Sequence, residues 1–198
     1  SGFAWAKSLT IVYDKAAPQT SYAAKKLSET LTGKGYEITS QESDYRINLS
    51  LQKDKLPAEA FSIIPDGKVI TVNGGDYRGV IYGALALVEM LRNGTKLEEV
   101  KAIEEKPNLE FRAIKFNLPW QTYRPSSALD QHYKTARDLK FWEAFLDMMV
   151  ENRFNAISLW NMHPYTFMIK AKNFPEASPW SDEEFAEWQH LYREIFRM

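Results

Sequence analysis

The second half of the chain alternates between buried strands and amphipathic helices, and this order restricts the possible folds more than any other feature. Residues 111–120 (FRAIKFNLPW) read as a strand ending in aromatic and amide residues, and residues 155–163 (NAISLWNMH) read as a second strand. Helices are predicted over residues 138–152, between the strands, and from residue 181 onward. This β-α-β-α order opens a (β/α)8 barrel, which needs eight strands to close. We therefore expect the chain to be the front end of a longer protein.

The first half of the chain predicts a separate α/β unit with a mixed sheet. Helices are expected from Pro18 to about Gly33 and over residues 78–92, and Pro65-Asp66-Gly67 is expected to turn a hairpin. The charged stretch 95–108 looks like a connection between domains. The fold class is therefore α/β, with an accessory domain at 1–106 and the truncated start of a barrel at 107–198. Strands are expected at 9–13, 36–39, 45–51, 61–64 and 69–72.

Charge and composition exclude several classes of function. The net charge is −1, with 25 basic and 26 acidic residues, which does not fit a nucleic-acid-binding surface. The chain has no Cys, which excludes disulfides, Cys-based metal sites and Cys nucleophiles. No apolar run is long enough to span a membrane. The six Trp and ten Tyr suit either a sugar-binding cleft or a packed core.

Four closely spaced glycines invite comparison with a phosphate-binding loop. Gly74, Gly75, Gly79 and Gly83 form a GGxxxGxxxG pattern, which is neither GxGxxG nor GxxxxGK[ST]. We interpret Gly74 and Gly75 as a turn that needs positive φ. Gly79 and Gly83 are one helical turn apart and should let a helix lie close to the sheet.

The best candidate binding residues lie at the carboxyl ends of the two strands of the second half, or just after them. In a barrel, the carboxyl ends of the strands surround the active site. Aromatic and amide groups there can stack on a polar ligand and hydrogen-bond it, whereas ordinary loop packing is the alternative. Arg124 can pair with a carboxylate such as a uronic acid, or be a solvated loop charge. The predicted substrate-binding residues are Asn117, Trp120, Arg124, Trp160, Asn161 and His163.

No catalytic, metal or cofactor site is expected within the chain. Its histidines, His132, His163 and His190, form no HExxH or HxH motif; His132 is placed in a polar loop and His190 on a helix surface. Acids that cleave glycosidic bonds come in pairs, but the carboxylates here fit structural roles. Asp138 is expected to cap a helix, and Ser181 to Glu184 to form a capping box. A solvated helix face is predicted for Glu143, Asp147 and Glu151, and a buried stripe for Trp142, Phe145, Leu146, Met149 and Val150.

Residues 61–91 (FSIIPDGKVITVNGGDYRGVIYGALALVEML) resemble the last hairpin and helix of a small α/β domain that precedes the barrel in some glycoside hydrolases. Examples are the family 20 β-hexosaminidases and the family 67 α-glucuronidases. The shared pattern is x-I-x-G-x-D-x-R-G-x-x-Y-G. Gly75, Asp76, Arg78, Gly79, Tyr82 and Gly83 stand in it.

The strand at 111–120 then resembles the first barrel strand of these enzymes. In family 20 this strand opens with an Arg that contacts sugar, and Arg112 stands in its place. Asn117 occupies the approximate place of an acid in the same strand. The catalytic Asp-Glu pair of family 20 lies on a later strand, so the resemblance carries no catalytic residue onto this chain.

The resemblance implies the N-terminal part of a glycoside hydrolase, with a carbohydrate substrate and a secreted or periplasmic location. Two alternatives are a non-catalytic carbohydrate-binding or assembly module and a small-molecule hydrolase with a doubly wound sheet; a missing GxSxG motif opposes the latter. A self-standing module should hide Phe116, Ile157 and Leu159. A truncated barrel should leave them uncovered and self-associate through its open strands.

Overall fold

The computed structural model describes residues 7–117, 129–159, 165–178 and 180–198. It divides into two compact units, Ser1–Glu110 and Phe111–Met198. The division lies four residues beyond the expected boundary between 106 and 107.

Unit 1 contains a six-stranded mixed sheet in the order β2-β1-β3-β5-β4-β6. Strand β1 is parallel to β2 and β3, and β3 is parallel to β5, whereas β4 runs antiparallel to β5 and β6. The expected mixed α/β architecture is confirmed. The strands are β1 (Ser8–Val12), β2 (Glu37–Ile38), β3 (Tyr45–Leu51), β4 (Phe61–Asp66), β5 (Val69–Gly74) and β6 (Ile103–Glu105).

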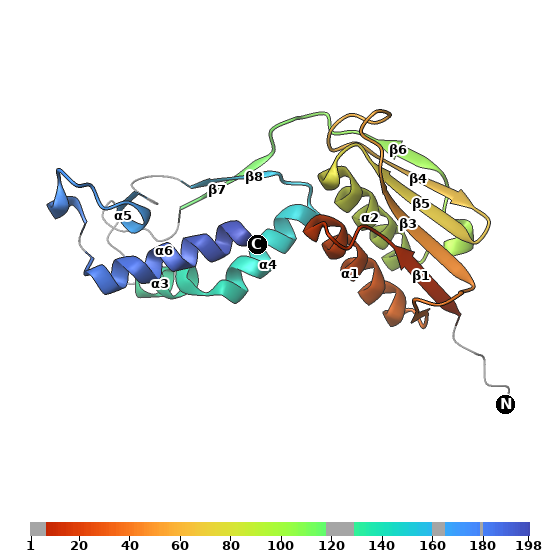
Figure 1. Cartoon of the computed structure of the whole chain (residues 1–198), viewed down its shortest axis with the longest axis horizontal. Coiled ribbons are helices and arrows are strands. Elements are labelled where there is room, and N and C mark those ends of the chain that lie inside the picture. Colours follow the sequence, from red (N-terminus) through yellow and green to blue (C-terminus); the bar gives the residue numbers. More distant parts are fainter. Residues whose placement is uncertain (1–6, 118–128, 160–164, 179) are drawn as a thin grey trace. The chain divides into compact units, whose positions relative to one another are not determined.

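Two helices of 16 residues each, α1 (Pro18–Gly33) and α2 (Tyr77–Arg92), pack side by side against one face of this sheet (Figure 1). Helix α1 has Pro at its start, and Asp76 caps α2. A short 3-10 helix, η1 (Leu97–Glu99), follows α2. Between helices and sheet lies an apolar core whose fully buried side chains include Leu27, Leu31, Ile47, Ile63, Val72 and Leu87.

Two details of unit 1 differ from expectation. Strand β4 continues through Pro65 to Asp66, and the hairpin turn is Gly67-Lys68, with Gly67 at φ 58°. The stretch 95–108, interpreted as a plain connection, contains β6, which pairs with β4 at the edge of the sheet. This strand has no apolar alternation because Glu104 and Glu105 are exposed, and charged side chains are common on strands at sheet edges.

Unit 2 contains a parallel pair of strands, β7 (Ala113–Phe116) and β8 (Ala156–Leu159). Helices α3 (Leu129–Arg137) and α4 (Leu139–Glu151) lie between them in the sequence. After β8 come α5 (Tyr165–Met168), η2 (Pro175–Ala177) and α6 (Asp182–Arg197). The placement of His132 in a polar loop was wrong, because His132 lies within α3. Strand β7 begins at Ala113 and β8 at Ala156, two residues and one residue later than predicted, and the predicted carboxyl ends of both strands lie outside the described residues.

An aromatic core holds unit 2 together. Phe116 of β7 packs against Trp142 and Phe145 of α4, with ring centroids 4.5 and 5.1 Å apart. Phe167 and Trp188 belong to the same cluster, and their ring centroids lie 4.4 Å apart. The indole N–H of Trp142 donates to the backbone oxygen of Ala136 at 2.8 Å, so its polar atom is satisfied inside the core. Most of the described aromatic side chains of unit 2 therefore belong to this core or pack against it, whereas Phe111, Phe174 and Phe196 are exposed.

Candidate functional site

The shared pattern around Asp76 is a structural joint within unit 1. One carboxylate oxygen of Asp76 accepts the backbone N–H of Gly79 at 2.7 Å and that of Glu59 at 3.0 Å. It therefore caps α2 and holds the turn before β4 at the same time. Glu59 has φ 61° and a side chain only 6% exposed, and Arg78 pairs with it at 2.8 Å. These contacts join the start of α2 to the turn before β4 within unit 1.

The glycines of the same pattern are needed for close backbone approach. Gly74 and Gly75 do not have positive φ, so the expectation of a left-handed turn was wrong. A Cβ on Gly75 would overlap the carbonyl oxygen of Pro57, and one on Gly79 would overlap that of Ala60. At Gly83 it would lie 2.6 Å from a methyl carbon of Val72 in the sheet. The interpretation of Gly79 and Gly83 as packing positions is confirmed.

Only one of the predicted substrate-binding residues is described by the structure. Asn117 directly follows β7, and its side-chain oxygen is buried with no hydrogen-bond partner in the described part of the chain. A buried amide oxygen without a partner costs free energy, which makes it a candidate acceptor for a ligand hydroxyl. The other five lie outside the described residues, so their gathering with Asn117 stays a prediction: Trp120, Arg124, Trp160, Asn161 and His163.

The two faces of the β7-β8 pair differ in chemistry. Paired residues share a face, so Phe116 lies beside Leu159, and both belong to the aromatic core or pack against it. The opposite face carries small or polar residues, of which Lys115 and Ser158 are exposed. By strand alternation Asn117 continues on the face of Lys115.

The burial of Phe116, Ile157 and Leu159 was expected to distinguish a self-standing module from a truncated barrel. Phe116 is 8% exposed, and Ile157 and Leu159 are partly buried. Their burial follows from helices within unit 2, because they point to the helix layer. It therefore does not distinguish a truncated barrel from a self-standing module. The opposite face, which would line a barrel's interior, is the informative one.

Arg112 does not stand near Asn117. It lies at the amino end of β7, where its Nε donates to the backbone oxygen of Arg153 at 2.6 Å and its backbone N–H donates to Asn155 Oδ1 at 3.0 Å. Arg153 has φ 63° in the turn that leads into β8. Arg112 therefore fastens the start of both strands, whereas the resemblance implied contact with sugar.

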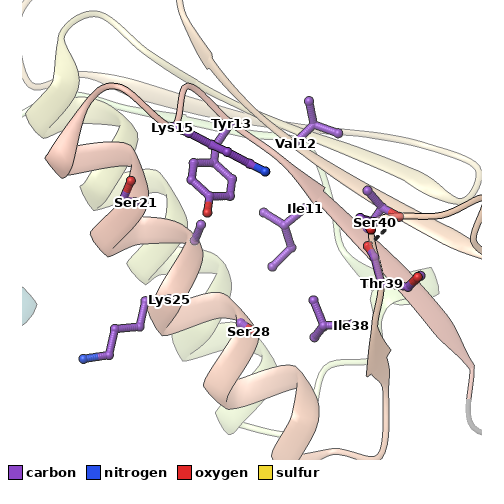
Figure 2. Close-up of a pocket in the computed structure, with 12 residues that line it drawn as sticks. Ile11, Val12, Tyr13, Lys15, Ser21, Lys25, Ser28, Ile38, Thr39 and Ser40 are labelled. Carbon is purple, nitrogen blue, oxygen red and sulfur yellow. Dashed lines mark hydrogen bonds between the residues drawn. The ribbon is translucent and has the colours of Figure 1, made fainter.

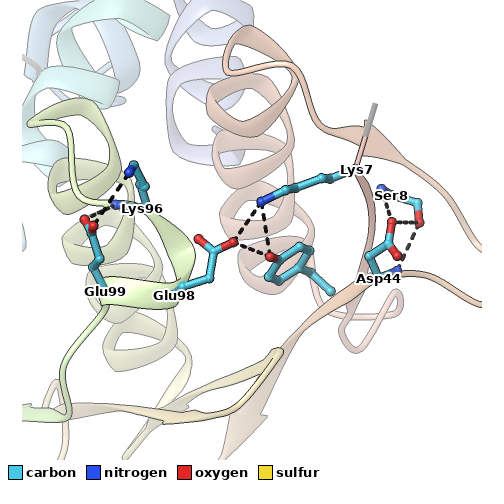
Figure 3. Close-up of polar contacts among 7 residues, drawn as sticks. Lys7, Ser8, Asp44, Lys96, Glu98 and Glu99 are labelled. Carbon is cyan, nitrogen blue, oxygen red and sulfur yellow. Dashed lines mark hydrogen bonds and ion pairs between the residues drawn. The ribbon is translucent and has the colours of Figure 1, made fainter. Parts of the chain in front are cut away.

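A polar cluster in unit 1 joins Lys7, the residue before β1, to Tyr45 of β3 and Glu98 of η1 (Figure 3). The hydroxyl of Tyr45 and the ammonium of Lys7 both donate to one oxygen of Glu98, the latter at 2.9 Å. The hydrogen bond from Tyr45, and then that from Lys7, lowers the pKa of Glu98 to about 2. The hydrogen bonds that Lys7 donates to Glu98 and then to Tyr45 raise the pKa of Lys7. Glu98 is therefore firmly ionised and poorly suited to act as a general acid near neutral pH. Sequence reasoning missed this cluster because its members are far apart in the chain.

The remaining carboxylates with a predicted role keep structural functions. Asp138 accepts the backbone N–H of Lys140 at 2.9 Å and caps α4, and Ser181 with Glu184 forms the predicted capping box of α6. Within the described ranges, no group of three or more His, Cys, Asp or Glu side chains is arranged to hold a metal ion. No helix in those ranges has the length and apolar character needed to cross a membrane.

The comparison with family models decides the relationship. The model described as glycosyl hydrolase family 20, domain 2, matches residues 1–104. The chain belongs to this family. The match covers the sheet, both helices of unit 1 and the joint around Asp76. The chain is thus a glycoside hydrolase-related domain, as the pattern at 61–91 indicated. No curated protein matches the chain by sequence.

Solved structures of glycoside hydrolases share the fold over most of the chain. A GH138 enzyme targeting pectin rhamnogalacturonan II is 27% identical, with a TM-score of 0.81 over 95% of the chain. A family 20 β-N-acetylglucosaminidase is 20% identical (TM-score 0.51, 78% of the chain). A GH115 4-O-methyl-α-glucuronidase with specificity for decorated arabinogalactans is 16% identical (TM-score 0.52, 92% of the chain). The chain spans 29%, 27% and 28% of these proteins, respectively.

Proposed function

We propose that the chain is the N-terminal part of a glycoside hydrolase that acts on a polysaccharide or oligosaccharide. The main support is the combination of a family 20 domain 2 at residues 1–104 with a parallel β7-β8 pair after it. The GH138 enzyme resembles both parts, since the likeness extends over 95% of the chain. Because the chain corresponds to 29% of that enzyme, we expect the natural protein to continue beyond this segment into the rest of a barrel.

Residues 107–198 are proposed to begin the (β/α)8 barrel. The parallel pair, with α4 between its strands in sequence and the aromatic core on one face, fits the repeating unit of such a barrel. The opposite face, with Lys115 and Ser158, would point inward. Asn117 would then stand at the mouth, its unpartnered oxygen available to a sugar hydroxyl.

The predicted residues around Asn117 complete a carbohydrate site. Trp120 and Trp160 would stack on the apolar faces of sugar rings, Asn161 and His163 would hydrogen-bond hydroxyls, and Arg124 would pair with a carboxylate. Cleavage would proceed through an oxocarbenium-like transition state with a pair of carboxylates on later strands. The segment 1–198 alone should be inactive, because the resemblance places the catalytic pair of carboxylates on a later strand.

A pectic polysaccharide is the first substrate to test, given the stated target of the GH138 enzyme. Polymers of this kind are met outside the cytosol, which favours a secreted or periplasmic location. Self-association of the isolated segment is proposed as well, since β7 and β8 each have an outer edge without a strand partner in the described part of the chain.

The test compares the natural protein, as its source makes it, with the 1–198 segment. Its intact mass is measured first, and both proteins are then incubated with rhamnogalacturonan II, with chromatography of released sugars. We expect the natural protein to have a mass tens of kilodaltons above the 22.9 kDa of the segment. We also expect the natural protein to release sugars and the segment to release none. A natural protein of the segment's own mass, with no release from pectic or host glycans, would instead support the non-catalytic binding module.

A further inference from the structure

A groove in unit 1 lies between α1 and the carboxyl-terminal half of β1, with a volume of about 530 Å³ (Figure 2). Its origin is the shortness of β2. Pairing of β1 with β2 ends at Leu9 and Ile38, and the backbone N–H of Thr39 then donates to the oxygen of Leu9. Thr10 holds the departing chain through hydrogen bonds of 3.1 and 2.9 Å to the oxygens of Thr39 and Gln41. Because β1 continues beyond this point, an open space remains beside it.

One wall of the groove is apolar and includes an aromatic ring. Ile11 and Ile38 point from the sheet into the space, and the Tyr13 ring extends toward α1 (Figure 2). All three side chains are partly exposed. The groove lies at the carboxyl end of β1, which is the end of parallel strands where α/β sheets usually bind ligands. Its volume falls within the range of roughly 300–1,000 Å³ typical of small-molecule sites.

The opposite wall and the rim are polar and cationic. Ser21 and Ser28 project from α1, and their hydroxyls make no hydrogen bond to the described residues. Lys15 lies at the same end as Tyr13 and has no ion-pair partner among the described residues. Lys25, at the rim, points away from the groove, and its Nζ lies 4.0 Å from Oε1 of Glu29. The residues that line the groove include two lysines and no carboxylate.

We propose that this groove binds a carboxylated oligosaccharide, with a uronate ring against Tyr13 and its carboxylate at Lys15. Sugar rings have apolar C–H faces and hydroxyl edges, which match the isoleucine-tyrosine wall and the serine hydroxyls. Lys15, which makes no ion pair with a described residue, favours an acidic sugar over a neutral one. This site lies within the family 20 domain 2 unit and is additional to the proposed barrel site, whose strands belong to the other unit. It would hold an acidic polymer close to the enzyme.

The test uses the isotope-labelled 1–198 chain and two-dimensional amide NMR. The probe is a tetramer of galacturonic acid, and the matched ligand is the same tetramer as its methyl ester, which keeps the rings and removes the charges. The acid should shift the amide signals of Tyr13, Lys15, Ser21 and Ser28, and added salt should weaken its binding. Lys15→Gln should weaken binding about threefold to fivefold, and Tyr13→Ala by at least fivefold. Lys101→Gln, an exposed lysine outside the groove, is the matched control and should leave binding unchanged.

Three results would overturn the proposal. Lys15 should select the carboxylate over its ester, so equal binding of the acid and the methyl ester contradicts the assignment. If Lys15→Gln and Lys101→Gln weaken binding equally, the overall charge of the unit, and not Lys15 in the groove, attracts the saccharide. Shifts confined to β7, β8 and Asn117 would place the saccharide at the proposed barrel site and leave the groove without a ligand. Amide spectra of each variant show directly whether it is folded.

Discussion

A close backbone contact in unit 1 lies at Gly79, and its replacement by Ala tests the joint around Asp76. The added Cβ would overlap the backbone oxygen of Ala60, so α2 must move away from the turn before β4. Overpacking costs about 3 kcal/mol at the upper end of its usual range. Loss of the Asp76 cap would add about 1 kcal/mol, whereas the higher helix propensity of Ala returns about 1 kcal/mol. The net loss is about 3 kcal/mol, which corresponds to a fall in melting temperature of roughly 10 °C or more.

The measurement is scanning calorimetry of the 1–198 chain, with hydrogen exchange of peptides from α2 assigning the transition to unit 1. Gly33→Ala is the matched control. It lies at the end of α1, lacks positive φ and has no atom within 4 Å of an added Cβ, so it should be neutral or slightly stabilising. If Gly79→Ala proves as stable as Gly33→Ala, then α2 is not pressed against this turn and the account of the joint fails.

Three further substitutions test electrostatics and packing. Contacts from Tyr45 and Lys7 lower the pKa of Glu98 from 4.5 to about 2, so their stabilisation is present above pH 4.5 and is lost as pH falls toward 2. Glu98→Gln should therefore flatten this acid limb in a series of melting curves. Burial raises the pKa of Tyr192 from 10 to about 12, so stability should fall as pH rises from 10 to 12, by up to about 3 kcal/mol; urea titrations should show less loss for Tyr192→Phe. Trp142→Ala should destabilise unit 2 by about 4 kcal/mol and leave the exchange rates of unit 1 unchanged, because Trp142 is 1% exposed within the unit 2 core.

Elements with a local signal in the sequence could be predicted. Strand β3 showed apolar alternation and has the predicted bounds, and the caps at Asp138 and Ser181 were visible as residue types at helix starts. Strand β6 has only three residues and two exposed glutamates, so no alternation marks it. The role of Gly75 depends on the backbone of Pro57, which approaches only in the folded chain. The sequence also marked Phe116 as an apolar strand residue without showing that its side chain packs against the helices.

The candidate site was less predictable than the fold for a related reason. Strand order places Asn117 at the end of β7, but its unpartnered oxygen is a property of the packed surroundings. Arg112 shows the opposite case, because a residue type that suits sugar contact is used to fasten the backbone of Arg153. For Asn117 and Arg112, the motif therefore predicted where each residue lies on β7 better than it predicted what the side chain binds.

The joint around Asp76 also affects how sequences of this kind are sorted. Its members contact one another and the turn before β4, so selection on folding alone is enough to preserve them. A search that uses this pattern will collect proteins by their shared architecture, whatever bond each one breaks. Grouping such enzymes by sugar will instead require comparison of the residues that follow the barrel strands, beginning at Asn117.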